Sequence, residues 1–219
     1  RGEIVVAQLT VPNEGSYTVT MNAQGRIKDW AEAEEGAIVN WNEEGITFTF
    51  GDVEQAGTHT EAPPPPPAPG MIEYETAAVT PIVQTISSDA IEGHTTFRLA
   101  LRLEGDAYDV YSIYGQEGHP MTIPPAFQNG GTFGVNVGGV NPAFFALDMP
   151  GAAGGEFDSW LTVGLTEGAG DELSNIGIQW PSWTDSTGLQ VTDGSVFWMT
   201  PQDGPTMTDR DGKTGAATE

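Results

Sequence analysis

The sequence predicts an all-β protein, a jelly-roll-like β-sandwich with an N-terminal β-hairpin or arm region. Two observations favour this class. Glycine and proline supply 29 and 16 of the 219 residues and separate short apolar runs, a pattern typical of many strands joined by tight turns. Helical periodicity is nearly absent, because the one helix-like stretch, 30–35, ends at Gly36 and is too short to organise a core.

The first strands are expected near the N-terminus. Segment 4–11 alternates apolar and polar side chains with the two-residue period of a strand, and its apolar face comprises Val5, Ala7, Leu9 and Val11. The turn 12–15 leads to a second strand at 17–21. Two more strands, joined by the turn 42–45, form a second predicted hairpin over 37–50.

A proline run is the strongest boundary in the chain. Five consecutive prolines, 63–67, are followed by Ala68-Pro69-Gly70, and such a run adopts an extended polyproline II conformation that cannot lie within a central strand. We therefore expect four parts. These are an arm region at 1–52, a proline-rich spacer at 53–73, a β-sandwich at 74–202 and a polar tail at 203–219.

The sandwich is predicted from the strand pattern after the spacer. Segment 95–103 places four apolar residues on one face and Arg98 and Arg102 on the other, so one face is expected in a core. Roughly eight strands over about 130 residues are typical of a jelly roll. The candidate strands are 78–86, 94–103, 110–114, 132–137, 143–147, 160–166, 176–179 and 196–199.

Charge and composition exclude several functions. Lys and Arg number 7 against 31 Asp and Glu, a net charge of −24 that opposes binding to nucleic-acid backbones or anionic membranes. No apolar run approaches the roughly 18 residues of a membrane helix. The absence of cysteine excludes disulfides, zinc–thiolate sites and thiol catalysis. Because the chain starts at Arg1, we expect a processed product or a segment of a longer chain.

Catalytic patterns are incomplete, and we predict a non-enzyme without cofactors. There is no G-x-S-x-G elbow, and the three histidines, His59, His94 and His119, form no H-x-x-x-H pair. Glu156 and Asp158 begin the E-x-D-x-x-E pattern of β-sandwich glycosidases. Leu161 stands where the third acid is needed, so a degraded glycosidase is only a third possibility.

Two weak ligand candidates remain. Asp209 and Asp211 resemble the first half of a calcium loop, but Lys213 occupies the next ligand position and a flexible polar linker is favoured. Trp180 and Trp183 form the best candidate for a sugar-stacking platform, whereas Trp160 and Trp198 are expected in the core.

Any glycan on this chain should be O-linked, because no N-x-S/T sequon occurs. The proline run, flanked by Thr58 and Thr60, is a candidate target in a protist or plant-like cell, and an unmodified spacer is the open alternative. The candidate sites are Pro63, Pro64, Pro65, Pro66, Pro67 and Pro69.

Much of the chain resembles a known kind of domain. The similarity rests on GHTTFRLA at 93–100, VYSIYG at 110–115, EFDSWLTVG at 156–164, SWTDSTGL at 182–189 and GSVFWM at 194–199. These segments resemble a domain, often repeated, of large secreted proteins of algae and related protists. The chain is also similar to subunits of extracellular glycosylated fibrils from freshwater microbes. The resemblance implies secretion, a surface or matrix role and repetitive assembly, and it carries no catalytic residues.

The sequence therefore predicts a non-enzymatic structural subunit of an extracellular filament, a homopolymer carrying O-linked glycans, with cations as candidate bridges between its acidic copies. Assembly is expected head to tail, with the N-terminal strand adding to a neighbour's sheet edge. The assembly arm comprises Ile4, Val5, Val6, Ala7, Leu9 and Val11. The alternative is a secreted carbohydrate-binding or adhesive β-sandwich module.

Overall fold

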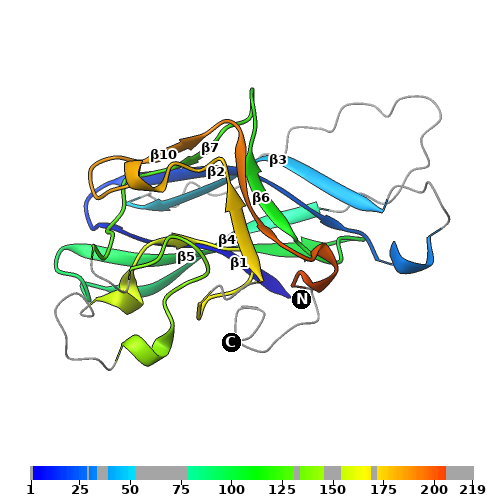
Figure 1. Ribbon diagram of the computed structural model, residues 1–219. Coiled ribbons are helices and arrows are strands. Elements are labelled where there is room, and N and C mark those ends of the chain that lie inside the picture. Colours follow the sequence, from blue (N-terminus) through cyan, green and yellow to red (C-terminus); the bar gives the residue numbers. More distant parts are fainter. Residues whose placement is uncertain are drawn as a thin grey trace.

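The protein is a β-sandwich. The computed structural model describes residues 2–28, 30–33, 39–52, 78–130, 134–145, 154–168 and 172–205. Two antiparallel sheets pack against each other (Figure 1), and no helix within these described ranges reaches seven residues. The predicted all-β class and sandwich architecture are confirmed.

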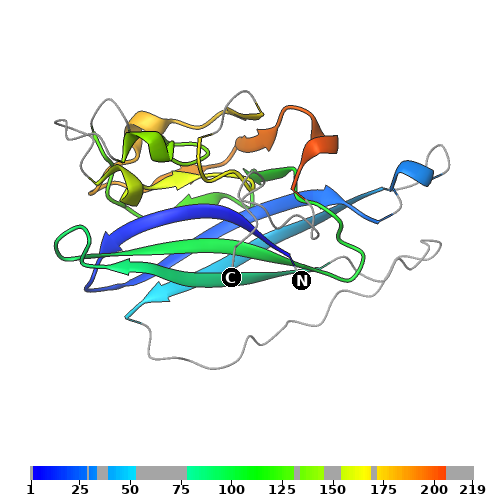
Figure 2. The same cartoon turned by 90° about the horizontal axis from the view of Figure 1, so that it is seen from below.

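The first sheet has four strands among the described residues. Their order is β4 (Ala78–Ser88), β5 (His94–Glu104), β1 (Glu3–Pro12) and β8 (Trp160–Leu161). Figure 2 shows the long strands β1, β5 and β4 side by side. Strand β1 pairs with β5 from Glu3↔Arg102 to Pro12↔His94, and with β8 at Ala7↔Leu161.

In the part of the chain that the structure describes, the second sheet has seven strands. Its path is β10 (Leu189–Val191), β7 (Met121–Ile123), β2 (Ser16–Arg26), β6 (Ser112–Gly115), β11 (Gly194–Trp198) and β9 (Leu173–Ile176), and β3 (Asn40–Gly51) pairs with β2. Short 3-10 helices join these strands. They are η1 (Trp30–Glu32), η2 (Pro142–Phe144), η3 (Gly155–Phe157), η4 (Trp180–Ser182) and η5 (Pro201–Asp203).

The core lies between the two sheets and follows the predicted alternation. In β5, the side chains of Leu99, Leu101 and Leu103 are buried while Arg98 and Arg102 are only half-buried on the other face. Trp160 and Trp198 are buried, as the sequence predicts. Burial of such apolar surface is the main favourable contribution to folding.

The prediction that the N-terminal strand is an assembly arm is wrong for this structure. Every residue from Ile4 to Val11 is at most 2% exposed, and the strand lies between β5 and β8 of its own chain. Its polar side chains are also covered, because Gln8 Nε2 donates to the carbonyl oxygens of Glu156 and Asp158 at 2.9 and 3.0 Å. A strand buried on both faces cannot be donated to a neighbour without opening the core.

The expected separation of 1–52 from the sandwich is likewise not observed. Strand β1 belongs to the first sheet, and β2 and β3 belong to the second, so the N-terminal strands and those from 78 onward form one sandwich. The described residues exclude 53–77, which holds the predicted spacer, and 206–219, which is most of the predicted tail.

Three local predictions also need correction. Strand β3 runs unbroken from Asn40 to Gly51 and pairs with β2, so the predicted turn at 42–45 is a bulge opposite the register shift between Met21 and Ala23. Gly45 allows this bulge through its positive φ of 70°. Where a strand was expected at 143–147, residues 142–144 form η2, whose Asn141 side chain accepts from Ala143 N. The described part of 132–137 makes only an isolated bridge at Val137.

Candidate functional site

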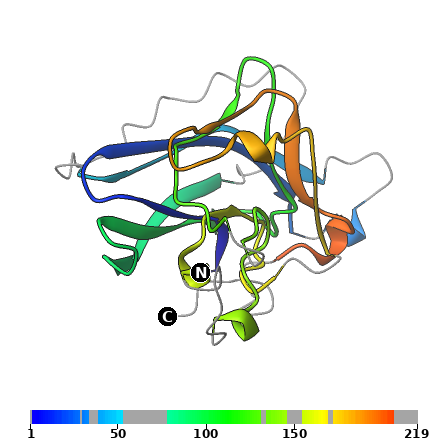
Figure 3. The same ribbon diagram turned by 60° about the vertical axis from the view of Figure 1, so that its left-hand side comes forward.

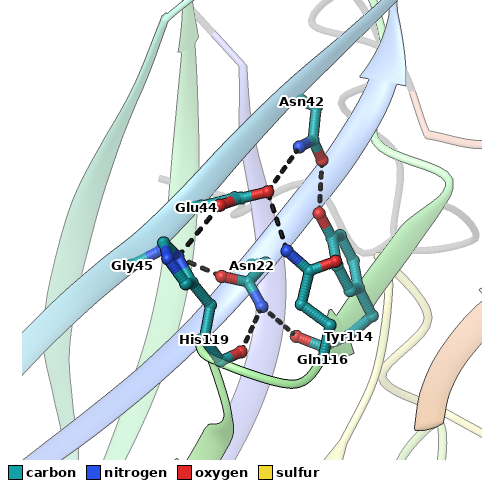
Figure 4. A network of polar contacts seen from close by, with 7 residues as sticks. All are labelled: Asn22, Asn42, Glu44, Gly45, Tyr114, Gln116 and His119. Atoms are coloured by element: carbon teal, nitrogen blue, oxygen red, sulfur yellow. Dashed lines mark hydrogen bonds and ion pairs between the residues drawn. The ribbon is translucent and has the colours of Figure 1, made fainter. Parts of the chain in front are cut away.

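The turn between β6 and β7 projects from the second sheet, at the top of Figures 1 and 3. Within it, the backbone N–H groups of Gln116 and His119 each donate to the other residue's carbonyl oxygen at 3.1 Å. The fully buried side chain of Asn22 on β2 ties this turn to the sheet. Its Nδ2 donates to the carbonyl oxygens of Tyr114 (3.0 Å) and His119 (2.8 Å), and its Oδ1 accepts from Gly45 N at 2.9 Å (Figure 4).

A carboxylate on β3 fixes the other side of the turn. Glu44 accepts from Gln116 Nε2 at 2.8 Å and pairs with His119 Nδ1 at 2.9 Å (Figure 4). The Tyr114 hydroxyl donates to Asn42 Oδ1 at 2.5 Å, and partial burial raises the pKa of this phenol. The side chains of Glu44 and His119 are 35% and 50% exposed. The network therefore holds the projecting turn in one position, and the side chains of Glu44 and His119 stay partly exposed to solvent.

Replacing Asn22 by Ala tests the role of this network. Three backbone groups each lose one hydrogen bond, so we expect a loss of about 2–3 kcal/mol in the free energy of unfolding, and faster amide exchange in residues 115–121. Asn40→Ala, at the exposed start of β3 and outside this network, is the matched control and should cost under about 1 kcal/mol. Urea unfolding with hydrogen exchange measures both. Equal effects of the two substitutions contradict the anchoring role.

A shallow depression lies beside the projecting turn. Its lining residues are Gln116, Glu117, Thr192 and Asp193. The last two belong to the turn between β10 and β11, and Thr192 is exposed. Amide, hydroxyl and carboxylate groups thus meet in a hollow, and together they can both donate and accept hydrogen bonds.

Two buried carboxylates serve the fold. Asp158 is 1% exposed and accepts from the backbone N–H groups of Asn129 and Val135 at 2.7 Å and of Ser159 at 3.0 Å. Burial raises the pKa of Asp158 to about 6, against the lowering effect of these donors. Glu156, the other acid of the suspected glycosidase pattern, is exposed. Asp158 therefore holds two loop segments together, and its oxygens are occupied by the backbone.

The second buried carboxylate, Asp109, forms an ion pair with Arg26. Their side chains are 1% and 5% exposed, and the closest atoms are 3.1 Å apart. Burial raises the pKa of Asp109 to about 6, although the backbone N–H and the charge of Arg26 lower it. The Arg26 guanidinium also lies 4.2 Å from the ring centroid of Trp30, a cation–π contact.

The predicted sugar-stacking pair is not a platform. Trp183 is only 3% exposed, and its Nε1 donates to the carbonyl oxygen of Pro124 at 3.0 Å. Trp180 is half-buried, and the two ring planes are inclined by 39°. The sandwich core takes Trp183 because a large aromatic side chain stabilises more when it is buried. The prediction for this pair is therefore wrong.

The remaining sequence candidates lie outside the described residues. These are the O-glycosylation candidates Pro63, Pro64, Pro65, Pro66, Pro67 and Pro69, and the weak metal candidates Asp209 and Asp211. In the described ranges, no group of three or more His, Cys, Asp or Glu is placed to hold a metal ion. No described helix is long and apolar enough to cross a membrane.

Strand β4 forms an edge of the first sheet. It pairs with β5 on one side, and no described strand bonds its other side. Its eleven residues, AVTPIVQTISS, include no charged side chain, and Ile86 is 42% exposed. The other long edge strand, β3, carries Glu43 and Glu44. Proteins commonly protect long edges with charges, prolines or bulges, and β4 has no charge but does have Pro81 and a bulge between Thr85 and Ser87.

Comparisons with known proteins identify no relative. No family model, no curated protein and no solved structure matches the chain. The resemblance to secreted algal and protist domains therefore stays a prediction.

Sequence reasoning missed the turn network and the open edge. The network joins β2, β3 and the β6–β7 turn, which are about 20 to 100 residues apart in the chain, so spacing alone does not reveal it. The edge strand had a recognisable feature in the sequence, because 78–86 is the longest predicted strand without a charged residue. That this strand lies at a sheet edge follows only from the sheet topology, which local sequence does not reveal.

Proposed function

We propose that the chain is a non-enzymatic structural subunit of an extracellular filament, in which copies pair along β4. The observation that carries this proposal is the uncharged edge of β4 in a chain of net charge −24. Two such chains repel each other, so close contact is favoured where both surfaces lack charge. An edge strand offers a row of backbone donors and acceptors that a second copy can satisfy.

The regular part of β4 is the stretch along which a second copy can pair. Residues 78–85 pair regularly with β5, and the bulge lies beyond them, between Thr85 and Ser87. Pro81 has no backbone N–H group. A register of the two copies that requires a donor at Pro81 therefore loses that hydrogen bond. Antiparallel pairing of β4 with its copy is isologous and closes a dimer. Growth of a filament then needs a second contact elsewhere on the dimer.

Placing a charge on β4 tests this function. Thr85 is exposed, and Thr85→Lys places on the edge strand a charge that pairing would have to desolvate, so we expect self-association at least about tenfold weaker. Thr192→Lys makes the same change of charge at an exposed position away from β4 and should leave association unchanged. Sedimentation and negative-stain electron microscopy measure the assembly.

Raising the ionic strength tests self-association independently of the lysine variants. Screening of the mutual repulsion should strengthen wild-type association as ionic strength rises. A wild-type protein that stays monomeric at high concentration in high salt contradicts the proposal. Equal assembly of the two lysine variants contradicts the β4 contact.

A further inference from the structure

The outer face of the second sheet carries an array of hydroxyl side chains. In β2 and β3 these alternate with buried apolar residues such as Val19 and Phe48, so they share the face that points away from the core. Register places Thr18 opposite Thr49, Thr20 opposite Thr47 and also opposite Thr122, and Thr122 opposite Gln190. We call this set the threonine face: Ser16, Thr18, Thr20, Thr47, Thr49, Thr122 and Gln190.

The array is regular and ordered. Same-face residues are about 6.6–6.8 Å apart along a strand, and neighbouring strands are about 4.7–4.9 Å apart. Thr20 Oγ1 bonds Thr122 Oγ1 at 2.5 Å and donates to the carbonyl oxygen of Pro120 at 3.3 Å, which connects the face to the projecting turn. Threonine is stiff at χ1, so little side-chain entropy is lost when such a surface binds a ligand.

Part of the threonine face is exposed, so a ligand can reach its hydroxyl groups. Thr18, Thr47 and Thr49 are exposed, and no described residue bonds the hydroxyl of Thr18 or Thr49. The strand β10 leads from Gln190 towards Thr192, which lines the depression beside the projecting turn. The threonine face and the depression are therefore adjacent.

We propose that the threonine face and the adjacent depression bind a neutral polysaccharide. The net charge favours this ligand, because a chain that carries −24 repels polyanions, whereas a polycation would bind its acidic side chains without needing an uncharged face. A sugar presents hydroxyl groups and C–H surfaces, and each threonine presents a hydroxyl and a methyl group. In the depression, Gln116, Glu117 and Asp193 supply further acceptors for sugar hydroxyls.

This site is independent of the proposed filament contact. The threonine face lies on the second sheet, whereas β4 is an edge of the first sheet. A bound polysaccharide would fasten the protein to a matrix, whether or not the protein also polymerises.

Pull-down of bacterially produced protein with amorphous cellulose, insoluble β-1,3-glucan and chitin tests the proposal, with alginate as the anionic control. We expect the wild type to bind at least one neutral polymer and not alginate. Thr18→Val with Thr49→Val removes two hydroxyls while keeping shape and charge, and should weaken binding about tenfold. Thr85→Val, on the first sheet, leaves both the threonine face and the depression intact and should bind within about twofold of the wild type.

A second pair of substitutions shows whether a loss of binding in the valine variant comes from misfolding. Thr18→Ser with Thr49→Ser keeps the hydroxyls and should retain most of the binding, and thermal melting verifies the fold of each variant. Absence of wild-type binding to all three neutral polymers overturns the proposal, as does equal binding by the valine and wild-type proteins. Unchanged polysaccharide binding by Thr85→Lys separates this site from the filament contact.

Discussion

Arg26→Met is expected to destabilise the protein by about 3–5 kcal/mol, because it leaves the Asp109 carboxylate buried without its ion-pair partner. The methionine keeps the apolar stem of the side chain, so most of the loss reports on charge. Asp109 lies at the centre of several contacts: it accepts from Arg26 N at 2.6 Å through its side chain, and its backbone carbonyl accepts from Trp41 Nε1 at 3.1 Å. The site thus fastens the end of β2 to the segment that precedes β6.

The chain offers a matched control for this prediction. Arg102 pairs with Glu3 on the outer face of the first sheet, where the two side chains are 35% and 16% exposed. Solvent screens this pair, so Arg102→Met should cost no more than about 1 kcal/mol. Urea unfolding at pH 7 measures both variants. Equal losses in the two variants contradict the expected effect of burial.

A double-mutant cycle separates the pair from its surroundings. Asp109→Asn alone should also be costly, since it leaves a buried guanidinium unpaired. The combined Arg26→Met and Asp109→Asn protein should lose less than the sum of the two single losses. Strict additivity shows that the two side chains act separately.

Local structure could be predicted wherever one short segment determined it. The alternation in 95–103 correctly identifies the buried face of β5, because burial of one face follows directly from the two-residue period. The same reasoning identified 4–11 as a strand, but it could not say which chain covers its apolar face. Gln8 and Thr10 made one side look exposed, whereas residues about 150 positions away bond both side chains and cover them.

The prediction of a turn at 42–45 was wrong for a related reason. Asn42-Glu43-Glu44-Gly45 has the composition of a hairpin turn, yet β2 offers a partner strand along the whole of β3 and turns this segment into a bulge. The bulge then places Glu44 against the β6–β7 turn. The candidate site therefore depends on pairing between distant segments, which local sequence patterns do not encode.

Asp158→Ala is expected to cost about 3–5 kcal/mol at pH 7, because three backbone N–H groups lose their acceptor in a buried loop junction. Glu156→Ala is the matched control. This residue lies two positions earlier, is exposed, and should change stability by less than about 0.5 kcal/mol. The pair also tests the glycosidase alternative, since a catalytic acid at Glu156 would show a loss of activity without a loss of stability.

The pH dependence of stability follows from the same carboxyl group. Burial raises the pKa of Asp158 to about 6, above the value of about 3.9 expected in the unfolded chain. Between these values the folded state binds more protons than the unfolded state, so the free energy of unfolding decreases as pH rises from about 4 to 6. A shift of about two pKa units corresponds to about 2–3 kcal/mol.

Asp109 contributes with the same sign, because burial also raises its pKa to about 6, and mutual repulsion among the other acids adds to the trend. Asp158→Asn isolates one contribution, since it removes a single titrating group and keeps the side-chain shape. Urea unfolding at pH 4.5 and pH 7 should therefore show a smaller loss of stability in Asp158→Asn than in the wild type. If both proteins lose the same free energy over this interval, the Asp158 carboxyl group does not titrate there, and its three N–H donors outweigh the effect of burial.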